Sequence, residues 1–144
     1  MRIKLVATPD SLDKDVKDVL DSLDKELFYD SPVCQKYGSW WWIVYDGDKP
    51  VAFAGLTPYP VNKTVFLSRC GVIKSYRGLG LQRKLIKKRE AIAIKEGYSR
   101  IITYTSYDNI KSANNLIGCG YKLYTPKWWW GVRHSYYFVK HINQ

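Results

Sequence analysis

The sequence contains no long apolar run and few of the residues that bind metals or form disulfides. No stretch of its 144 residues approaches the ~18 apolar residues that a membrane span needs, and the apolar run at its start is too short for a signal peptide. The three cysteines, Cys34, Cys70 and Cys119, form no Cys-x-x-Cys pair, which excludes a disulfide scaffold and a zinc ribbon. The two histidines have no partners at ligand spacing, so no metal site is expected. These absences predict a cytoplasmic protein with reduced, mostly buried thiols and no membrane partner.

Acidic residues become scarce after residue 30. Residues 1–30 carry 5 basic and 8 acidic side chains, whereas residues 31–144 carry 18 basic and 5 acidic ones, a formal charge of +13. A cationic field of this size favours anionic partners such as phosphates, a nucleotide cofactor or nucleic acid. The alternative is a basic surface that only keeps the protein in solution, and charge alone does not decide between the two.

The composition and the hydrophobic patterns predict one domain over residues 1–144 with a mixed α/β (α+β) fold. Apolar residues make up 46% of the chain and aromatic residues 15%, which is enough for a core. Helices are expected over residues 12–27, after a turn and N-cap at 8–11, and over 81–96 and 109–119. Strands are expected over residues 2–8, 39–45, 50–56, 64–72, 100–105, 121–124 and 136–140. Pro58 and Pro60 are expected to end the strand that begins at residue 50.

All six tryptophans lie in two runs, Trp40–Trp42 and Trp128–Trp130. Because successive side chains of a strand face opposite sides, either Trp41 or the pair Trp40 and Trp42 must lie in the core. The second run falls in an expected loop, where exposed indole rings would stack on a base, a sugar or an aromatic amine, or hold a cation. A hydrophobic lid or a homodimer contact explains that run equally well.

The clearest chemical signal is a basic loop with two glycines. The strand that is expected to end at Val72 leads into the loop 74–80, and Gly78 and Gly80 come just before the helix 81–96. The first turn of a helix has unpaired N–H groups and a positive dipole end, and glycine lets an anion approach the backbone. This pattern predicts a cradle for a phosphate or pyrophosphate. A Walker loop and a dinucleotide fingerprint are excluded because their further glycines, lysine or acid are missing, and an ordinary strand–turn–helix junction is the alternative.

Two segments of the sequence, in the order in which they occur, resemble motifs of the GNAT superfamily of acyl-CoA-dependent N-acyltransferases. The segment Arg77-Gly78-Leu79-Gly80-Leu81-Gln82 is similar to the family's phosphate loop, Arg/Gln-x-x-Gly-x-Gly/Ala, and departs from it at Gln82. The segment from Asn109 to Tyr121 is similar to the family's helix that begins Asn-x-x-Ser/Ala and ends in Gly-Phe/Tyr. The resemblance implies a single GNAT-like domain with a central, mostly antiparallel mixed sheet, splayed at the cofactor site and flanked by helices.

The resemblance also implies that acetyl-CoA is the co-substrate, without a metal, and that three segments bind it. The residues that would contact it are Cys70, Gly71, Val72, Arg77, Gly78, Leu79, Gly80, Leu81, Gln82, Asn109, Ser112 and Asn115. The backbone of the first segment would face the acetyl group and the pantetheine arm, and the N–H of Val72 would polarise the thioester carbonyl. The N–H groups of residues 77–82 would hold the pyrophosphate, and the side chains of the third segment would line the pantetheine.

The family's usual acid and base are missing from this sequence. Leu116 stands seven residues after Asn109, where many members have a tyrosine acid. No Asp or Glu lies between Asp48 and Glu90, the region in which many members carry a glutamate base. Proton transfer would run through water or through another side chain, and the candidates are Tyr121, Tyr124, Ser68, Asn115 and His134. Cys70 is expected to be a packed thiol, because no histidine is near it in the sequence.

The sequence therefore predicts an N-acetyltransferase that moves an acetyl group from acetyl-CoA to a primary amine of a small molecule or a protein, by direct attack in a ternary complex. Three other hypotheses stay open. The chain would be a GNAT-type toxin that acetylates aminoacyl-tRNA, a non-enzymatic basic module that binds nucleic acid, or a GNAT-fold domain that binds the cofactor without turnover.

Overall fold

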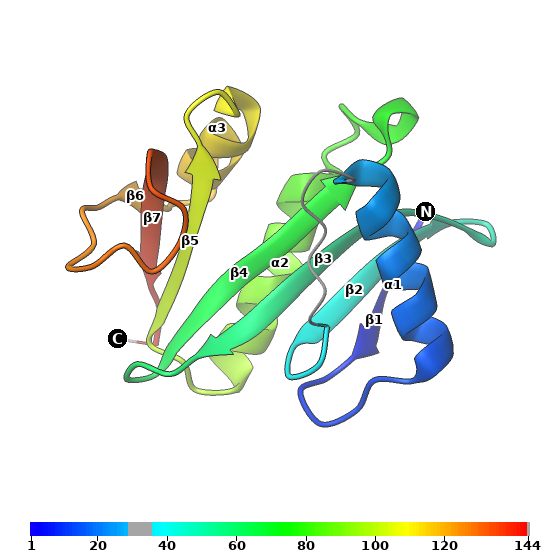
Figure 1. Ribbon diagram of the computed structural model, residues 1–144, viewed down its shortest axis with the longest axis horizontal. Coiled ribbons are helices and arrows are strands. Elements are labelled where there is room, and N and C mark those ends of the chain that lie inside the picture. The colour runs from blue at the N-terminus through cyan, green and yellow to red at the C-terminus, as the bar shows by residue number, and fades with distance from the viewer. Residues whose placement is uncertain (29–35, 144) are drawn as a thin grey trace.

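A seven-stranded sheet with helices on both faces forms the centre of the computed structural model, which describes residues 1–28 and 36–143 (Figure 1). The strand order is β1-β2-β3-β4-β5-β7-β6, and every neighbouring pair is antiparallel except β4 and β5. The strands are β1 (Arg2–Ala7), β2 (Trp40–Asp46), β3 (Lys49–Tyr59), β4 (Thr64–Val72), β5 (Arg100–Ser106), β6 (Lys122–Leu123) and β7 (Ser135–His141). The helices are α1 (Lys14–Leu27), the 3-10 turn η1 (Lys74–Tyr76), α2 (Leu81–Lys95) and α3 (Ile110–Gly118). The predicted mixed, mostly antiparallel sheet is confirmed.

Helix α1 begins later than its hydrophobic pattern predicts. Its N-cap is Asp13, not a residue of the segment 8–11. Thr8 and Ser11 instead exchange two backbone hydrogen bonds of 3.0 and 3.2 Å, which close a tight turn of their own. Because these backbone groups are already paired, the helix starts after this turn.

Strand β3 is longer than predicted, because Pro58 does not end it. Pro58 pairs with Val65 of β4, and the strand continues to Tyr59. The other neighbour, β2, ends its pairing with β3 at Leu56. Beyond that residue β3 has a strand on one side only, and such an edge is where a residue without an N–H donor is tolerated.

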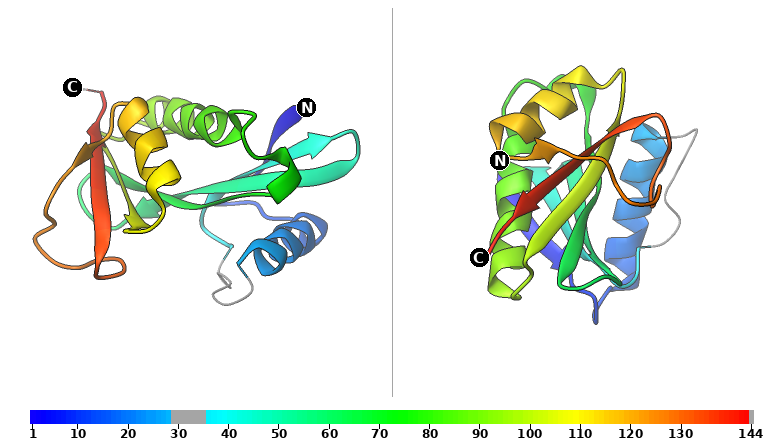
Figure 2. Two further views of the ribbon diagram at one scale, coloured as in Figure 1. Left: turned by 90° about the horizontal axis from the view of Figure 1, so that it is seen from above. Right: turned by 90° about the vertical axis from the view of Figure 1, so that its left-hand side faces the viewer.

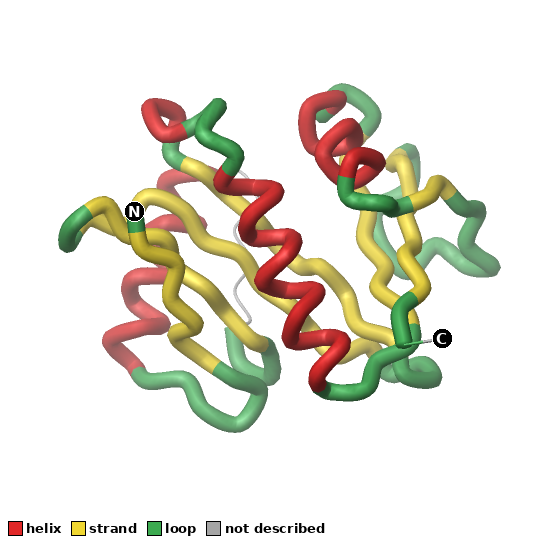
Figure 3. Tube along the Cα trace, turned by 180° about the vertical axis from the view of Figure 1, so that it is seen from behind, coloured by secondary structure: helices red, strands yellow, loops and turns green. Residues whose placement is uncertain are grey.

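The two faces of the sheet are covered by different helices. Figure 2 shows α1 on one face of the sheet and α2 on the other. Figure 3, seen from behind, shows α2 lying over the strands. Trp41 packs with Leu20 and Phe53 on the α1 side, whereas Trp40 and Trp42 belong to the larger cluster on the α2 side. All three tryptophans are therefore buried. The sequence requires either Trp41 or the pair Trp40 and Trp42 to lie in the core. All of them lie there, because neither face of β2 is exposed to solvent.

The sheet opens between β4 and β5 (Figure 1). Only residues 64–66 of β4 pair with β5, at residues 100–102, although both strands continue beyond this point. Just past the last pair, the Thr103 hydroxyl donates to the Leu67 carbonyl at 3.0 Å. From there the two strands diverge, as the predicted splay requires, and the ends of β4 and β5 flank an opening between them.

A bulge lies in β4 beside this opening. Ala54 pairs with Cys70 and Leu56 pairs with Leu67, so Ser68 and Arg69 together oppose the single residue Gly55 of β3. Such an extra residue bends the strand and turns its following residues. The bulge therefore sets the direction of the segment Cys70–Val72 that leads into the glycine loop.

A buried ion-pair network fixes α1 against β4. Asp24 of α1 is 1% exposed, and its carboxylate contacts the Lys36 ammonium at 2.8 Å and the Arg69 guanidinium at 3.1 Å. Lys36 is itself fully buried, and its carbonyl accepts the Trp41 indole N–H at 2.8 Å. Asp24 therefore lies in the interior and pairs with basic side chains there, whereas Asp13, Asp15 and Asp18 of the same segment are exposed to solvent.

Candidate active site

A first cavity lies where β4, the glycine loop and the first turns of α2 and α3 meet. Its volume is about 480 Å³. Its wall contains all the residues that the sequence predicts for the cofactor except Leu79, whose side chain is half exposed. Three separate segments of the sequence, at 70–72, 77–82 and 109–115, are thus brought together around one space.

The backbone at the start of α2 has the geometry of an anion cradle. Gly78 and Gly80 have φ angles of +83° and +77°, which disfavour other residues, and Gly80 is the N-cap of α2 in the left-handed conformation. The first turn of α2 contains no acidic residue. Arg77, Arg83 and Lys111 add positive charge to the wall. Unpaired N–H groups and this charge together suit a pyrophosphate.

The Val72 N–H is directed away from β3. The next residue, Ile73, donates its N–H to the Val51 carbonyl at 2.9 Å, so Ile73 faces β3. Because successive residues of an antiparallel strand direct their backbone groups to opposite sides, those of Val72 face the other way. The Val72 carbonyl accordingly accepts the Arg77 Nε–H at 3.0 Å. The Val72 N–H therefore lies on the side of β4 that faces the opening.

Gln82, the residue that departs from the family's loop, ties α2 to α3. Its amide donates to the Ser112 hydroxyl at 2.8 Å and accepts from the Asn115 amide at 2.8 Å. Arg83 donates to the Asn115 amide oxygen at 2.9 Å. Asn109 caps α3 by accepting the Ser112 N–H at 3.2 Å. A glycine or alanine at position 82 could not make these bonds, so here a side-chain network fixes the distance between the two helices.

The second cavity, of about 580 Å³, occupies the opening between β4 and β5. It shares Phe28, Cys70, Gln82, Asn109 and Ser112 with the first cavity, so the two spaces adjoin. Its remaining wall comes from β3, β4 and β5, the inner side of α2, α3, and residues 37, 39 and 41 at and before the start of β2. A molecule that extends from the glycine loop between the strands would reach this second space.

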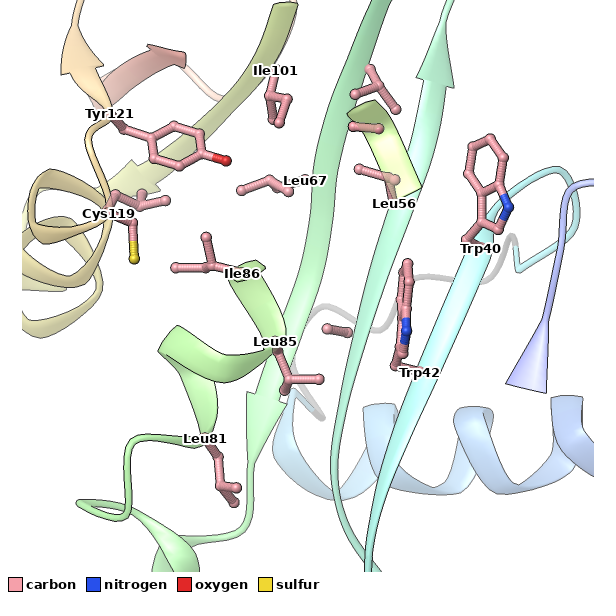
Figure 4. Close-up of a cluster of buried hydrophobic side chains, with 14 of the residues drawn as sticks. Trp40, Trp42, Leu56, Leu67, Leu81, Leu85, Ile86, Ile101, Cys119 and Tyr121 are labelled. Carbon is pink, nitrogen blue, oxygen red and sulfur yellow. The ribbon is translucent and has the colours of Figure 1, made fainter. Parts of the chain in front are cut away.

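Of the proton-transfer candidates, Ser68 and Asn115 line one of these two cavities and the other three line neither. Among the described residues the buried Ser68 hydroxyl has no hydrogen-bond partner, and it lies in the wall of the second cavity. Tyr121 lies in the core beside Leu67 and Ile86 (Figure 4), where burial raises its pKa. Tyr124 accepts the Trp130 indole N–H at 2.9 Å, and His134 is exposed on the loop before β7. Leu116, at the position of the absent tyrosine, lines the second cavity.

Arg89 is a residue of the second cavity that sequence reasoning missed. It is 2% exposed and its guanidinium donates to two backbone carbonyls, those of Leu85 and of Gly55 at the bulge, each at 3.2 Å. Among the described residues no carboxylate forms an ion pair with it, because the adjacent Glu90 pairs with Lys140 at 2.9 Å. Arginine stays protonated even when burial lowers its pKa, as it does here. Its position four residues after Leu85, on the apolar face of α2, is the sequence signal that could have found it.

Cys70 is a packed thiol, as expected. Burial raises the pKa of this thiol, and the nearby charge of Arg89 opposes that effect without reversing it. A thiol with a raised pKa is a poor nucleophile, because the thiolate is the reactive form. Cys70 therefore forms part of the wall of both cavities. Cys34 lies outside the described residues.

Comparison with known proteins identifies the family. Residues 9–121 match the model of the acetyltransferase (GNAT) family. The chain belongs to this family. The Xenopus tropicalis protein named Probable N-acetyltransferase 14 is 36% identical over 90 residues, which make up 62% of this chain and 43% of that protein. This GNAT chain thus matches less than half the length of that relative.

Solved structures of GNAT acetyltransferases share the fold. The ribosomal-protein-S18-alanine N-acetyltransferase from Escherichia coli superimposes with a TM-score of 0.77 at 14% identity, over 99% of this chain and 96% of that one. An acetyltransferase from Bacillus subtilis in complex with CoA gives 0.73 at 16% identity, over 98% of each chain. A GNAT acetyltransferase from Elizabethkingia anophelis with acetyl-CoA bound gives 0.72 at 10% identity, over 98% and 97%. The predicted GNAT fold is confirmed.

Two features are absent from residues 1–28 and 36–143. No helix there is both long and apolar enough to cross a membrane. No three His, Cys, Asp or Glu side chains gather there as a metal site would need.

Proposed function

We propose that this GNAT chain transfers an acetyl group from acetyl-CoA to a primary amine by direct attack in a ternary complex. The observation that carries the proposal is the continuity of the two cavities. The first lies at the positive end of α2 and suits a pyrophosphate, and the second opens between β4 and β5 where a thioester and an amine would meet. In this assignment residues 77–82 hold the pyrophosphate, and Asn109, Ser112 and Asn115 line the pantetheine arm.

The proposed reaction places the thioester carbonyl against the Val72 N–H. The amine nitrogen attacks the carbonyl carbon, the new C–N bond forms and the C–S bond breaks. The CoA thiolate leaves and gains a proton, and the nitrogen loses one. A backbone donor aimed at the carbonyl oxygen stabilises the charge that develops on it during attack. The direction of the Val72 N–H, away from β3, supports this role.

Arg89 offers an electrostatic substitute for the missing base and acid. A buried positive charge in the cavity wall disfavours the ammonium form of an incoming amine and so increases its reactive, neutral fraction. The same charge favours the negative thiolate as it leaves. We therefore assign Arg89 a role in tuning the reacting groups, with water carrying the protons.

Two of the other hypotheses are less well supported. A non-enzymatic nucleic-acid module does not account for the match to an acetyltransferase family over residues 9–121. Acetylation of aminoacyl-tRNA rests only on the basic charge of residues 31–144, and coenzyme A itself needs basic residues. Neither hypothesis explains why the two cavities adjoin.

Thermal melting in the presence of acetyl-CoA tests cofactor binding independently of the acceptor. At 100 times its Kd the ligand should stabilise the fold by about 2.7 kcal/mol, which raises the Tm by several degrees in a domain of this size. ATP serves as the control, because it carries phosphates and adenine but no pantetheine arm. The proposal predicts a saturable shift with acetyl-CoA and little shift with ATP. No shift at millimolar acetyl-CoA would remove its basis.

A further inference from the structure

The second cavity, which under the proposed function receives the acceptor, has a distinctive charge. Its described wall contains two arginines, Arg69 and Arg89, and no Asp or Glu. The nearby acid Asp24 is buried and bound to Lys36 and Arg69, so its charge is already neutralised. An acceptor with a second ammonium group would meet no carboxylate in this wall and would be repelled by Arg89.

Besides Asp24, two described acids lie beside residues of the wall without forming part of it. Glu90 follows Arg89 in the sequence, and its carboxylate pairs with the Lys140 ammonium at 2.9 Å. Asp108 follows β5 and is exposed, and its carboxylate accepts a hydrogen bond from the Ser106 hydroxyl at 2.6 Å. Ser106 lines the cavity. An exposed carboxylate at the rim is screened by water and salt, so it does not offset a buried guanidinium in the wall.

The same wall is rich in aromatic rings. Phe28, Tyr37, Trp41, Phe66 and Tyr104 all line it. Phe66 of β4 and Tyr104 of β5 stack with their ring planes 9° apart and their centroids 6.1 Å apart, at the point where the pairing of the two strands ends. Flat apolar walls of this kind favour a planar or apolar ligand body.

The 124–134 loop supports this aromatic wall from behind. Trp130 places its ring edge-on against Phe66 and Tyr104, at centroid distances of 5.3 and 5.4 Å. Its N–H is bonded to Tyr124, which holds the ring in place. Trp128 and Trp129 are about half exposed on the same loop. In the second tryptophan run, Trp130 therefore holds the aromatic wall in place, whereas Trp128 and Trp129 are partly exposed beside it.

We propose that the acceptor is a primary amine on an aromatic body that carries no second positive charge. This inference rests on the proposed function and names its substrate class. The aromatic rings select the body of the acceptor, and the guanidinium in a wall whose described residues include no carboxylate selects against diamines and polyamines. A peptide N-terminus is a different class of acceptor. A higher kcat/KM for such a peptide than for an aromatic amine would contradict the proposal.

The test compares acceptors by thiol release from acetyl-CoA, with the acetylated product identified by mass. The panel contains 2-phenylethylamine, hexylamine, 1,5-diaminopentane and a peptide with a free N-terminal alanine. We expect kcat/KM for 2-phenylethylamine to exceed that for 1,5-diaminopentane by about 10-fold or more, the factor that about 1.4 kcal/mol of transition-state discrimination produces, with hexylamine between them. Preference for the diamine or the peptide, or turnover of none of the four by protein that acetyl-CoA stabilises, would overturn the acceptor class. Absence of that stabilisation would instead contradict the proposed function.

A pair of variants tests the charge argument inside the cavity. Thr57 lines the wall, and its hydroxyl lies 2.7 Å from the Ser39 hydroxyl. Thr57→Asp adds a carboxylate that can accept from Ser39, and Thr57→Asn is the matched neutral control. We expect the ratio of kcat/KM for 1,5-diaminopentane to that for 2-phenylethylamine to rise by about 10-fold in T57D relative to T57N. An equal ratio in the two variants would show that wall charge does not select the acceptor.

Discussion

Replacing Arg89 by methionine should lower kcat at neutral pH by about tenfold or more and shift the pH profile of kcat to higher pH by about one unit. Under the proposed function the buried guanidinium lowers the pKa of the bound amine, so its removal raises that pKa and leaves less neutral amine at pH 7. Methionine keeps most of the length and apolar packing of the arginine stem. The measurement is the pH dependence of kcat with saturating 2-phenylethylamine, beside a melt that reports stability.

Arg89→Lys is the matched control, because it keeps the charge and loses the fork that reaches the Gly55 carbonyl. If charge is what matters, R89K keeps a profile near that of the wild type, although its rate falls. If both variants lose the same activity with unshifted profiles, Arg89 only supports the bulge in β4 and the electrostatic assignment is wrong.

Gly55→Ala should destabilise the fold by about 1–3 kcal/mol, because the added methyl group has no room. A Cβ at this position would contact the Ser68 hydroxyl and lie 2.6 and 2.7 Å from two atoms of the Trp41 ring. Trp41 cannot retreat easily, since it is 1% exposed and its indole N–H is bonded to the Lys36 carbonyl. The measurement is the free energy of unfolding in denaturant, and a drop in Tm of several degrees should accompany it.

Gly118→Ala controls for the addition of a methyl group as such. Its Cβ would lie as close as 2.5 Å to a neighbour, but that neighbour is the guanidinium end of Arg83, an exposed and flexible side chain. We expect G118A to cost much less stability than G55A. Equal losses, or a neutral G55A, would show that the bulge and Trp41 yield more readily than their packing indicates.

The sequence predicts well those features that depend on local chemistry. Gly78 and Gly80 occupy the two positive-φ positions of the loop, and Asn109 caps α3, because backbone conformation and capping are decided within a few residues. The opening between β4 and β5 was expected only through the family resemblance. The pairing of β4 with β5 stops at Phe66, close to the bulge in β4. It depends on contacts between segments that are far apart in the sequence.

The acceptor side of the site was harder to predict for a physical reason. The sequence places Arg89 on a helix, and charged residues on a helix usually face solvent, so its residue type alone does not indicate a place in the site. Its burial depends on the Gly55 carbonyl, 34 residues away in the sequence. In the same way, the role of Trp130 as a support for Phe66 and Tyr104 emerges only when β4, β5 and the 124–134 loop are placed together.

The most direct measurement of the central claim is an amide chemical-shift map of the ¹⁵N-labelled protein titrated with acetyl-CoA. We expect the largest changes at residues 70–72, 77–82 and 109–115, where the first cavity meets the opening of the sheet. Replacing acetyl-CoA by CoA should alter the Val72 amide in particular, because its N–H would lose the thioester carbonyl. Changes confined to β1, α1 or β7, with the glycine loop unaffected, would contradict this account of the site.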